Sequence, residues 1–69
     1  MIIELENPRA LGPDDPRGIV IVAQGGVITT RKVTDKGVMP FEEITPEGDF
    51  EEALAAKIDF LTTVGFQIV

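Results

Sequence analysis

The hydrophobic and polar positions of residues 18–33 predict a β-hairpin. Ile19–Ala23 is the most apolar run in the sequence, and a second β-prone run begins at Val27 after the pair Gly25-Gly26. Glycine adopts the positive φ that a two-residue hairpin turn requires, so the glycine pair marks the turn. Because the first run is apolar on both sides, we expect it inside a sheet with both faces covered.

A two-residue turn sorts the hairpin side chains onto two faces of the sheet. One face carries Ile19, Ile21, Ala23, Ile28 and Thr30. The opposite face carries Val20, Val22, Gln24, Val27, Thr29 and Arg31. The first face has the bulkier apolar side chains and is expected to meet a helix. The second face needs another cover, either the connecting loops or a second copy of the chain, and we predict self-association through its valines, Val20, Val22 and Val27.

Two further segments fit strands near the sheet edges. Residues 2–6 alternate, with Ile3 and Leu5 on one side and glutamates on the other, as in a half-buried strand. Residues 38–44 form a second candidate. Pro40 places that segment at an edge, because proline cannot donate a ladder hydrogen bond.

The segment after residue 49 carries the period of an amphipathic helix. Its apolar stripe recurs at three- and four-residue spacing and comprises Phe50, Ala53, Leu54, Ile58, Leu61 and Val64. Asp49 is the expected N-cap, with Glu52 three residues further on in a capping-box arrangement. An alternative start has Thr45 as the cap and Pro46 as the first helical residue.

Gly65 and the residues after it predict how the helix ends. Gly65 fits the left-handed residue of a helix C-terminus, with Phe66 folding back onto Leu61. The remaining residues predict a last short strand with Phe66 and Ile68 facing the core. The elements together predict a single α+β domain over residues 1–69, in which a mostly antiparallel sheet of about three to five strands packs against one C-terminal helix.

Composition narrows the ways in which so small a domain is stabilised. The 69 residues include no Cys, which excludes disulfides, and no His, so we expect no metal site and no cofactor. Self-association is the remaining way to extend the core, and we expect a homodimer through the free sheet face or an edge strand. No apolar run is long enough to span a bilayer and nothing marks the chain for export, so we expect a cytoplasmic protein without membrane contact.

Charge and its distribution suggest the kind of partner. The formal net charge of −6 argues against direct binding of nucleic acid, which depends on clustered Lys and Arg. Half of the twelve carboxylates lie within eleven positions, namely Glu42, Glu43, Glu47, Asp49, Glu51 and Glu52. One interpretation is a helix N-terminus with a solvated loop. The other is a docking surface for a basic protein partner, or an imitation of a phosphate backbone that occupies a nucleic-acid-binding protein. In either case, complementary charge would speed association with the partner.

Lys57 falls near the centre of the apolar helix stripe, where an unpaired buried ammonium is costly. Three explanations stay open. In the first, its methylenes lie along the core edge while the amine reaches water. In the second, it forms a buried or interfacial ion pair with a glutamate such as Glu4 or Glu42. In the third, burial lowers its pKa for proton transfer or Schiff-base chemistry.

Two other segments contain residues that occur in ligand-binding loops, but the residues around them favour a structural role. Residues 8–17 hold three prolines and a glycine, so we expect a connection without regular structure. Asp14 and Asp15 within it lack the ligand spacing of an EF-hand and fit a solvated turn. The pair Gly25-Gly26 lacks the following helix or the Lys-Ser or Lys-Thr pair of phosphate-binding loops, so we interpret it as a turn.

Side chains that carry catalysis are scarce. His, Cys, Tyr and Trp are all missing, which removes the usual general base, the thiol nucleophile and the best stacking rings. We therefore expect no catalytic residues and a non-enzymatic interaction protein, a small regulator or inhibitor such as a viral accessory protein, that docks through its acidic surface. The alternatives are a structural self-assembly module and a small-molecule binder that uses Arg9, Arg17 and Lys57.

Overall fold

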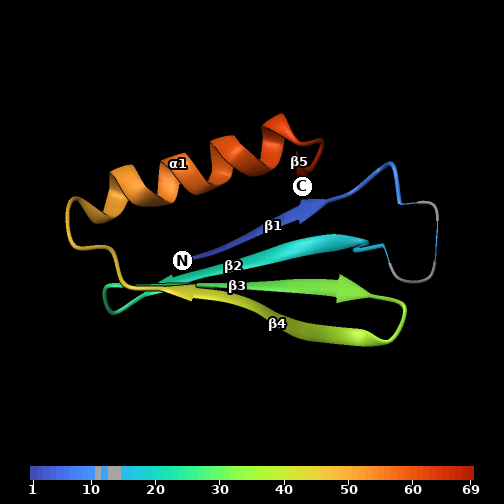
Figure 1. The fold of residues 1–69 in the computed structure, drawn as a ribbon, viewed down its shortest axis with the longest axis horizontal. Helices are drawn as coiled ribbons and strands as arrows, with labels where there is room; N and C mark the ends of the chain where they lie inside the picture. Colours follow the sequence, from blue (N-terminus) through green and yellow to red (C-terminus); the bar gives the residue numbers. More distant parts are fainter. Residues whose placement is uncertain (11, 13–14) are drawn as a thin grey trace.

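A computed structural model describes residues 1–10, 12 and 15–69, and in them a five-stranded antiparallel sheet packs against one helix (Figure 1). The elements along the chain are β1 (Ile2–Glu6), β2 (Gly18–Gln24), β3 (Val27–Thr34), β4 (Gly37–Ile44), α1 (Phe50–Thr63) and β5 (Gln67–Ile68). The strand order across the sheet is β4-β3-β2-β1-β5. The predicted α+β fold is therefore confirmed, and β4 forms an edge of the sheet as expected.

The central hairpin of β2 and β3 has the predicted register. Gln24 pairs with Val27 across the turn, and the two turn residues have positive φ, 61° at Gly25 and 78° at Gly26. Two consecutive positive-φ residues are typical of a type I′ turn, whose twist matches that of the flanking strands. The glycine pair therefore fixes which side chains of both strands share a face.

The sheet has an inner face, which meets α1, and an outer face, which does not. The core lies on the inner face and consists of Leu5, Ile19, Ile21, Ala23, Ile28, Leu54 and Leu61. Every hairpin side chain that was predicted to face the helix is buried there, including Thr30. The outer face of β2 has no covering layer among the described residues, whereas cover on both faces was expected.

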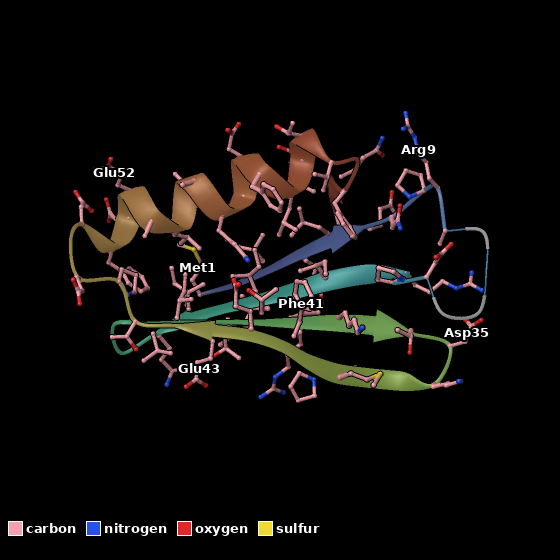
Figure 2. All side chains as sticks on the ribbon, in the orientation of Figure 1. Met1, Arg9, Asp35, Phe41, Glu43 and Glu52 are labelled. Carbon is pink, nitrogen blue, oxygen red and sulfur yellow. The ribbon has the colours of Figure 1, made fainter. Side chains whose placement is uncertain are left out.

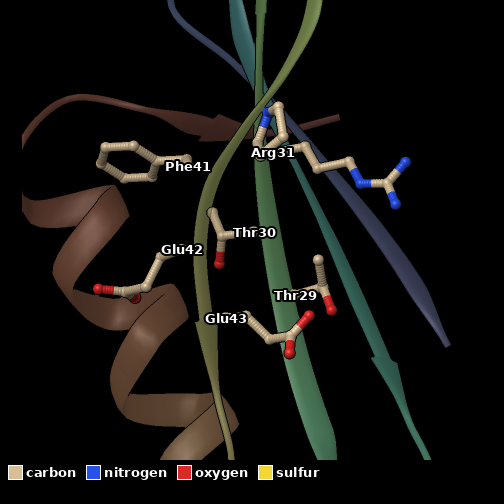
Figure 3. A pocket seen from close by; sticks show the side chains of 7 residues that line it. Thr29, Thr30, Arg31, Phe41, Glu42 and Glu43 are labelled. Carbon is tan, nitrogen blue, oxygen red and sulfur yellow. The ribbon is translucent and has the colours of Figure 1, made fainter.

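A β-bulge interrupts the pairing of β3 with the edge strand β4. Thr30 pairs with Glu42 whereas the next residue, Arg31, pairs with Pro40, so Phe41 is the extra residue of the bulge. A bulge bends its strand and re-aims side chains. Figure 3 shows the result, because Phe41 and Glu42 both point toward α1 although they are neighbours in a strand.

Helix α1 begins at its predicted cap. The Asp49 side chain accepts hydrogen bonds from the backbone N–H groups of Glu51 and Glu52, with its Oδ1 at 2.9 and 3.2 Å from the two nitrogens. These bonds satisfy two of the amide groups that the first turn of a helix leaves without partners. The alternative start with Thr45 as the cap is therefore wrong, since the helix begins at Phe50.

The helix ends in a Schellman motif at Gly65, whose φ is 118°. The N–H of Phe66 donates to the carbonyl of Leu61 at 3.0 Å, and the N–H of Gly65 donates to that of Thr62 at 3.2 Å. Phe66 also packs against the core, as predicted.

Two residues that were predicted to face the core are exposed instead. Val64 is the C-cap of α1 and is 54% exposed, because it lies at the rim of an open space between the helix and the sheet. Ile68 lies opposite Leu5 in the register but is 59% exposed, because β5 is a two-residue edge strand. Both predictions of burial are wrong.

Candidate functional site

The six carboxylates of the predicted acidic docking surface do not form one surface. Glu42 lies on the inner face and forms an ion pair with Lys57. Asp49 is occupied as the helix cap. Both side chains are therefore engaged within the fold, where they stabilise the helix and its contact with β4.

The other four acidic side chains are exposed, and they point in different directions. Glu43 pairs with Thr29 across β3 and β4, and Figure 3 shows both side chains on the outer face. Glu51 and Glu52 occupy the first turn of α1, where they favour the positive end of the helix dipole. Figure 2 shows Glu52 on the helix and Glu43 on the far side of the sheet.

Lys57 lies at the edge of the core rather than in its centre. Its side chain is 13% exposed, whereas that of its partner Glu42 is 43% exposed. The ammonium nitrogen also lies 5.9 Å from the ring centroid of Phe41, on the edge strand. Of the three explanations for Lys57, the structure shows the ion pair with a glutamate, which is Glu42.

The outer face has an apolar centre, and two opposite charges flank one of its valines. Val20 and Val22 are half-buried on the central strand β2, and Val27 is half-buried beside the hairpin turn. In the register, Glu4 of β1 and Arg31 of β3 flank Val20 on its two sides. Both charged side chains are exposed, and Figure 3 shows Arg31 pointing away from α1.

The basic residues of the predicted small-molecule site are not brought together. Arg17 forms a two-pronged ion pair with Asp35, with its Nε at 2.9 Å from one carboxylate oxygen and a second nitrogen at 3.0 Å from the other. The hydrogen bonds and charge of Asp35 raise the pKa of Arg17. Lys57 pairs with Glu42 instead, so Arg17 and Lys57 form ion pairs in different parts of the fold.

The predicted turn in the proline-rich connection is described only in part. Asp14 lies outside the described residues, while Asp15 accepts a hydrogen bond from the backbone N–H of Gly12 at 3.1 Å. Within the described part of the chain, no three acidic, His or Cys side chains gather in a way that could hold a metal ion. The one described helix is also too short to cross a membrane.

Sequence reasoning missed three residues that contribute to the surfaces of this fold. Phe41 and Lys32 meet over the inner face, with the lysine nitrogen 6.0 Å from the ring centroid. Phe60 is 60% exposed on α1 beside them. The adjacent proline was the one available signal for Phe41, since proline in a strand often accompanies a bulge.

The comparisons with known proteins add no family to this picture. No protein-family model matches the chain, and no curated protein or solved structure shows a significant match to it. The functional interpretation therefore depends on the surfaces described above.

Proposed function

We propose that the protein is a non-enzymatic protein-interaction module whose outer sheet face pairs with a second copy of the chain. The observation that carries the proposal is the open outer face, with Val20 and Val22 half-buried at its centre. A sheet with one solvated face normally alternates apolar and polar residues, so that its open side is polar. In β2 the outward-pointing Val20 and Val22 are apolar as well, which favours a second covering layer.

The exposed surface of the whole chain supports a missing layer. The chain exposes 4750 Å², whereas a folded monomer of 7.5 kDa is expected to expose about 4,250 Å². A standard protein–protein interface removes about 800 Å² from each partner. An interface of that size on the outer face would remove more surface than the difference between these two areas.

The two charges beside Val20 favour a second copy as the partner. In the proposed dimer, the outer faces of two copies face each other across a two-fold axis. The axis lies between the two faces, above Val20, and runs parallel to β2. This axis places Glu4 of each copy opposite the partner's Arg31, because the two residues lie one strand away on either side of β2. Neighbouring strands are about 4.8 Å apart and packed sheets cross at about −30°, so the paired groups stay within reach of their long side chains.

The first experiment adds a charge to the centre of the outer face. Val22→Glu should convert a dimer into a monomer in sedimentation equilibrium, because the interface would have to bury an unpaired carboxylate. Ala55→Glu adds the same charge to an exposed position of α1 and should leave the dimer intact. A wild-type chain that is monomeric at every concentration, or a Val22→Glu variant that still dimerises, would contradict the proposal.

A second experiment tests the symmetry of the pairing. Glu4→Arg and Arg31→Glu should each weaken the dimer, because each places like charges opposite one another across the interface. The double variant should recover most of the lost affinity, because it restores opposite charges at both places. A double variant that is weaker than either single variant would exclude this pairing.

A second candidate function is docking of a basic protein at the start of α1. The observation that favours it is the exposure of Glu47, Glu51 and Glu52, which have no ion-pair partner among the described residues. Changing these three glutamates to Gln, with Glu42 and Asp49 kept, preserves the internal ion pair and the helix cap. A purified basic partner that docks here should bind more weakly at higher salt and should lose most of its affinity for the variant. A partner that binds the variant as tightly as the wild type would show that it docks elsewhere.

The non-enzymatic part of the proposal is supported by the side chains that the chain lacks, since it has no His, Cys, Tyr or Trp. These residues supply the commonest acids, bases and nucleophiles of enzymes. A chain without cysteine also needs no oxidising compartment for its folding, which fits the proposed cytoplasmic location.

A further inference from the structure

An apolar groove opens on the inner face, between the C-terminal half of α1 and the strands β2, β3 and β4. Its volume is about 330 Å³. Buried Ile19 and Leu61 form its floor, and its rim includes Phe41, Phe60 and Val64, which are 56%, 60% and 54% exposed. Small-molecule pockets have volumes of about 300–1,000 Å³ and mostly apolar walls, so the groove is of a size that holds a small ligand.

Lys32 is the one charged residue among the described residues that line the groove. It lies in β3 among the residues that line the groove, and its ammonium nitrogen is 6.0 Å from the ring centroid of Phe41. No carboxylate of the described residues forms an ion pair with it. The nearby cation Lys57 differs in this respect, because Glu42 neutralises it.

We propose that the groove binds a small amphipathic monocarboxylate, with its carboxylate at Lys32 and its apolar body between Phe60, Val64 and Phe66. A single unneutralised ammonium beside an apolar wall matches one negative charge on an apolar chain or ring. A phosphate or polyanion would require several cations, and the net charge of −6 repels it. The inference stands apart from the proposed dimer, because the groove and the outer face lie on opposite sides of the sheet.

The test is an NMR titration of the ¹⁵N-labelled protein with octanoate. Its amide shifts should concentrate around Lys32, Phe60 and Val64. Octanol, which has the same apolar chain without the charge, and octylammonium, which has the opposite charge, should bind at least about tenfold more weakly, as expected for the loss of one charge-assisted hydrogen bond. Equal binding of octanol and octanoate would overturn the assignment of the carboxylate to Lys32.

Two substitutions locate the site. Lys32→Met keeps the apolar stem and removes the charge, so it should weaken octanoate binding about tenfold and leave octanol binding unchanged. Lys36→Met makes the same change in the exposed turn between β3 and β4, and it should leave both affinities at the wild-type values. No binding of octanoate to the wild type, or an equal loss in both variants, would refute the proposal.

The dimer and the groove can fail independently. Val22→Glu should abolish dimerisation while octanoate still binds, because Val22 points to the outer face. Loss of octanoate binding in this variant, with the fold intact by circular dichroism, would mean that the groove depends on the dimer and would overturn the inference as stated.

Discussion

Replacing Thr30 by Val should stabilise the protein. Thr30 is 1% exposed at the centre of the inner face, opposite Glu42 of the edge strand. Its hydroxyl oxygen has no hydrogen-bond partner among the described residues. Valine has nearly the same shape as threonine and carries a methyl group where the hydroxyl lies, so the substitution removes the buried polar atom without opening a cavity.

The size of the effect follows from the cost of a buried polar group without a partner. That cost is about 1–3 kcal/mol, and the extra methyl volume offsets part of the gain. The free energy of unfolding of Thr30→Val should therefore rise by about 1 kcal/mol. For a domain of this size, such a change raises the melting temperature by about 4–8 °C.

Thr34 in the same strand is the matched control. It is 9% exposed, but its hydroxyl donates to the carbonyl of Gly37 at 3.2 Å and accepts a hydrogen bond from the backbone N–H of Lys36 at 3.2 Å. Thr34→Val deletes both bonds and leaves the partners at the turn without them. The same chemical change should therefore lower the free energy of unfolding by about 1 kcal/mol.

Urea unfolding followed by circular dichroism measures both variants. All samples need one protein concentration, because the proposed dimerisation would make the apparent stability depend on concentration. The slope of unfolding free energy against urea should stay unchanged, since the surface exposed on unfolding is the same. A Thr30→Val variant that loses as much stability as Thr34→Val would refute the reasoning, because it would show that the Thr30 hydroxyl has a partner in solution.

Further predictions follow from single contacts. Asp49→Ala should destabilise the protein by about 1 kcal/mol, because it removes the side-chain acceptor for two amides of α1; the loss appears in thermal unfolding, and Asp49→Asn should retain most of the stability. Gly18→Ala would place its Cβ 2.6 Å from the backbone carbonyl oxygen of Leu5, so it should cost about 1–3 kcal/mol in urea unfolding. Gly65→Ala forces a side chain to a φ of 118° and should destabilise the helix end by at least about 1 kcal/mol, whereas Gly48→Ala, with open space around it, should change stability little.

The parts of the fold that local chemistry determines were predictable from the sequence. The turn at Gly25-Gly26 sets the register of β2 and β3, and once the register is known the sharing of faces follows from strand geometry. The helix start at Asp49 and its end at Gly65 follow in the same way from hydrogen bonds between close neighbours in the sequence.

The features that depend on distant contacts were not predictable. The bulge at Phe41 moves one side chain to the inner face, and nothing periodic in the sequence marks it. The helix stripe indicates which side of α1 meets the sheet but not which of its positions the sheet covers, so the exposure of Val64 was missed. The groove beside Lys32 depends on both features, since Phe41 and Val64 both line it.

The acidic run shows the same limit. Its residues are neighbours in sequence, but the strand pairing and the helix separate Glu43 from Glu52 and give Glu42 to Lys57. For the outer face, in contrast, the structure reveals a charge pattern that the sequence did not predict. The β1–β2 register, which the sequence left open, brings Glu4 beside Val20 and creates the charge pattern of the proposed dimer.

The mass of the wild-type protein in solution tests the central claim most directly. If the outer faces of two copies pair, sedimentation equilibrium should give twice the 7.5 kDa of one chain, with dissociation only on dilution. A mass of one chain up to the highest concentration at which the protein stays dissolved would contradict the account, since the valines of the outer face would then remain in water.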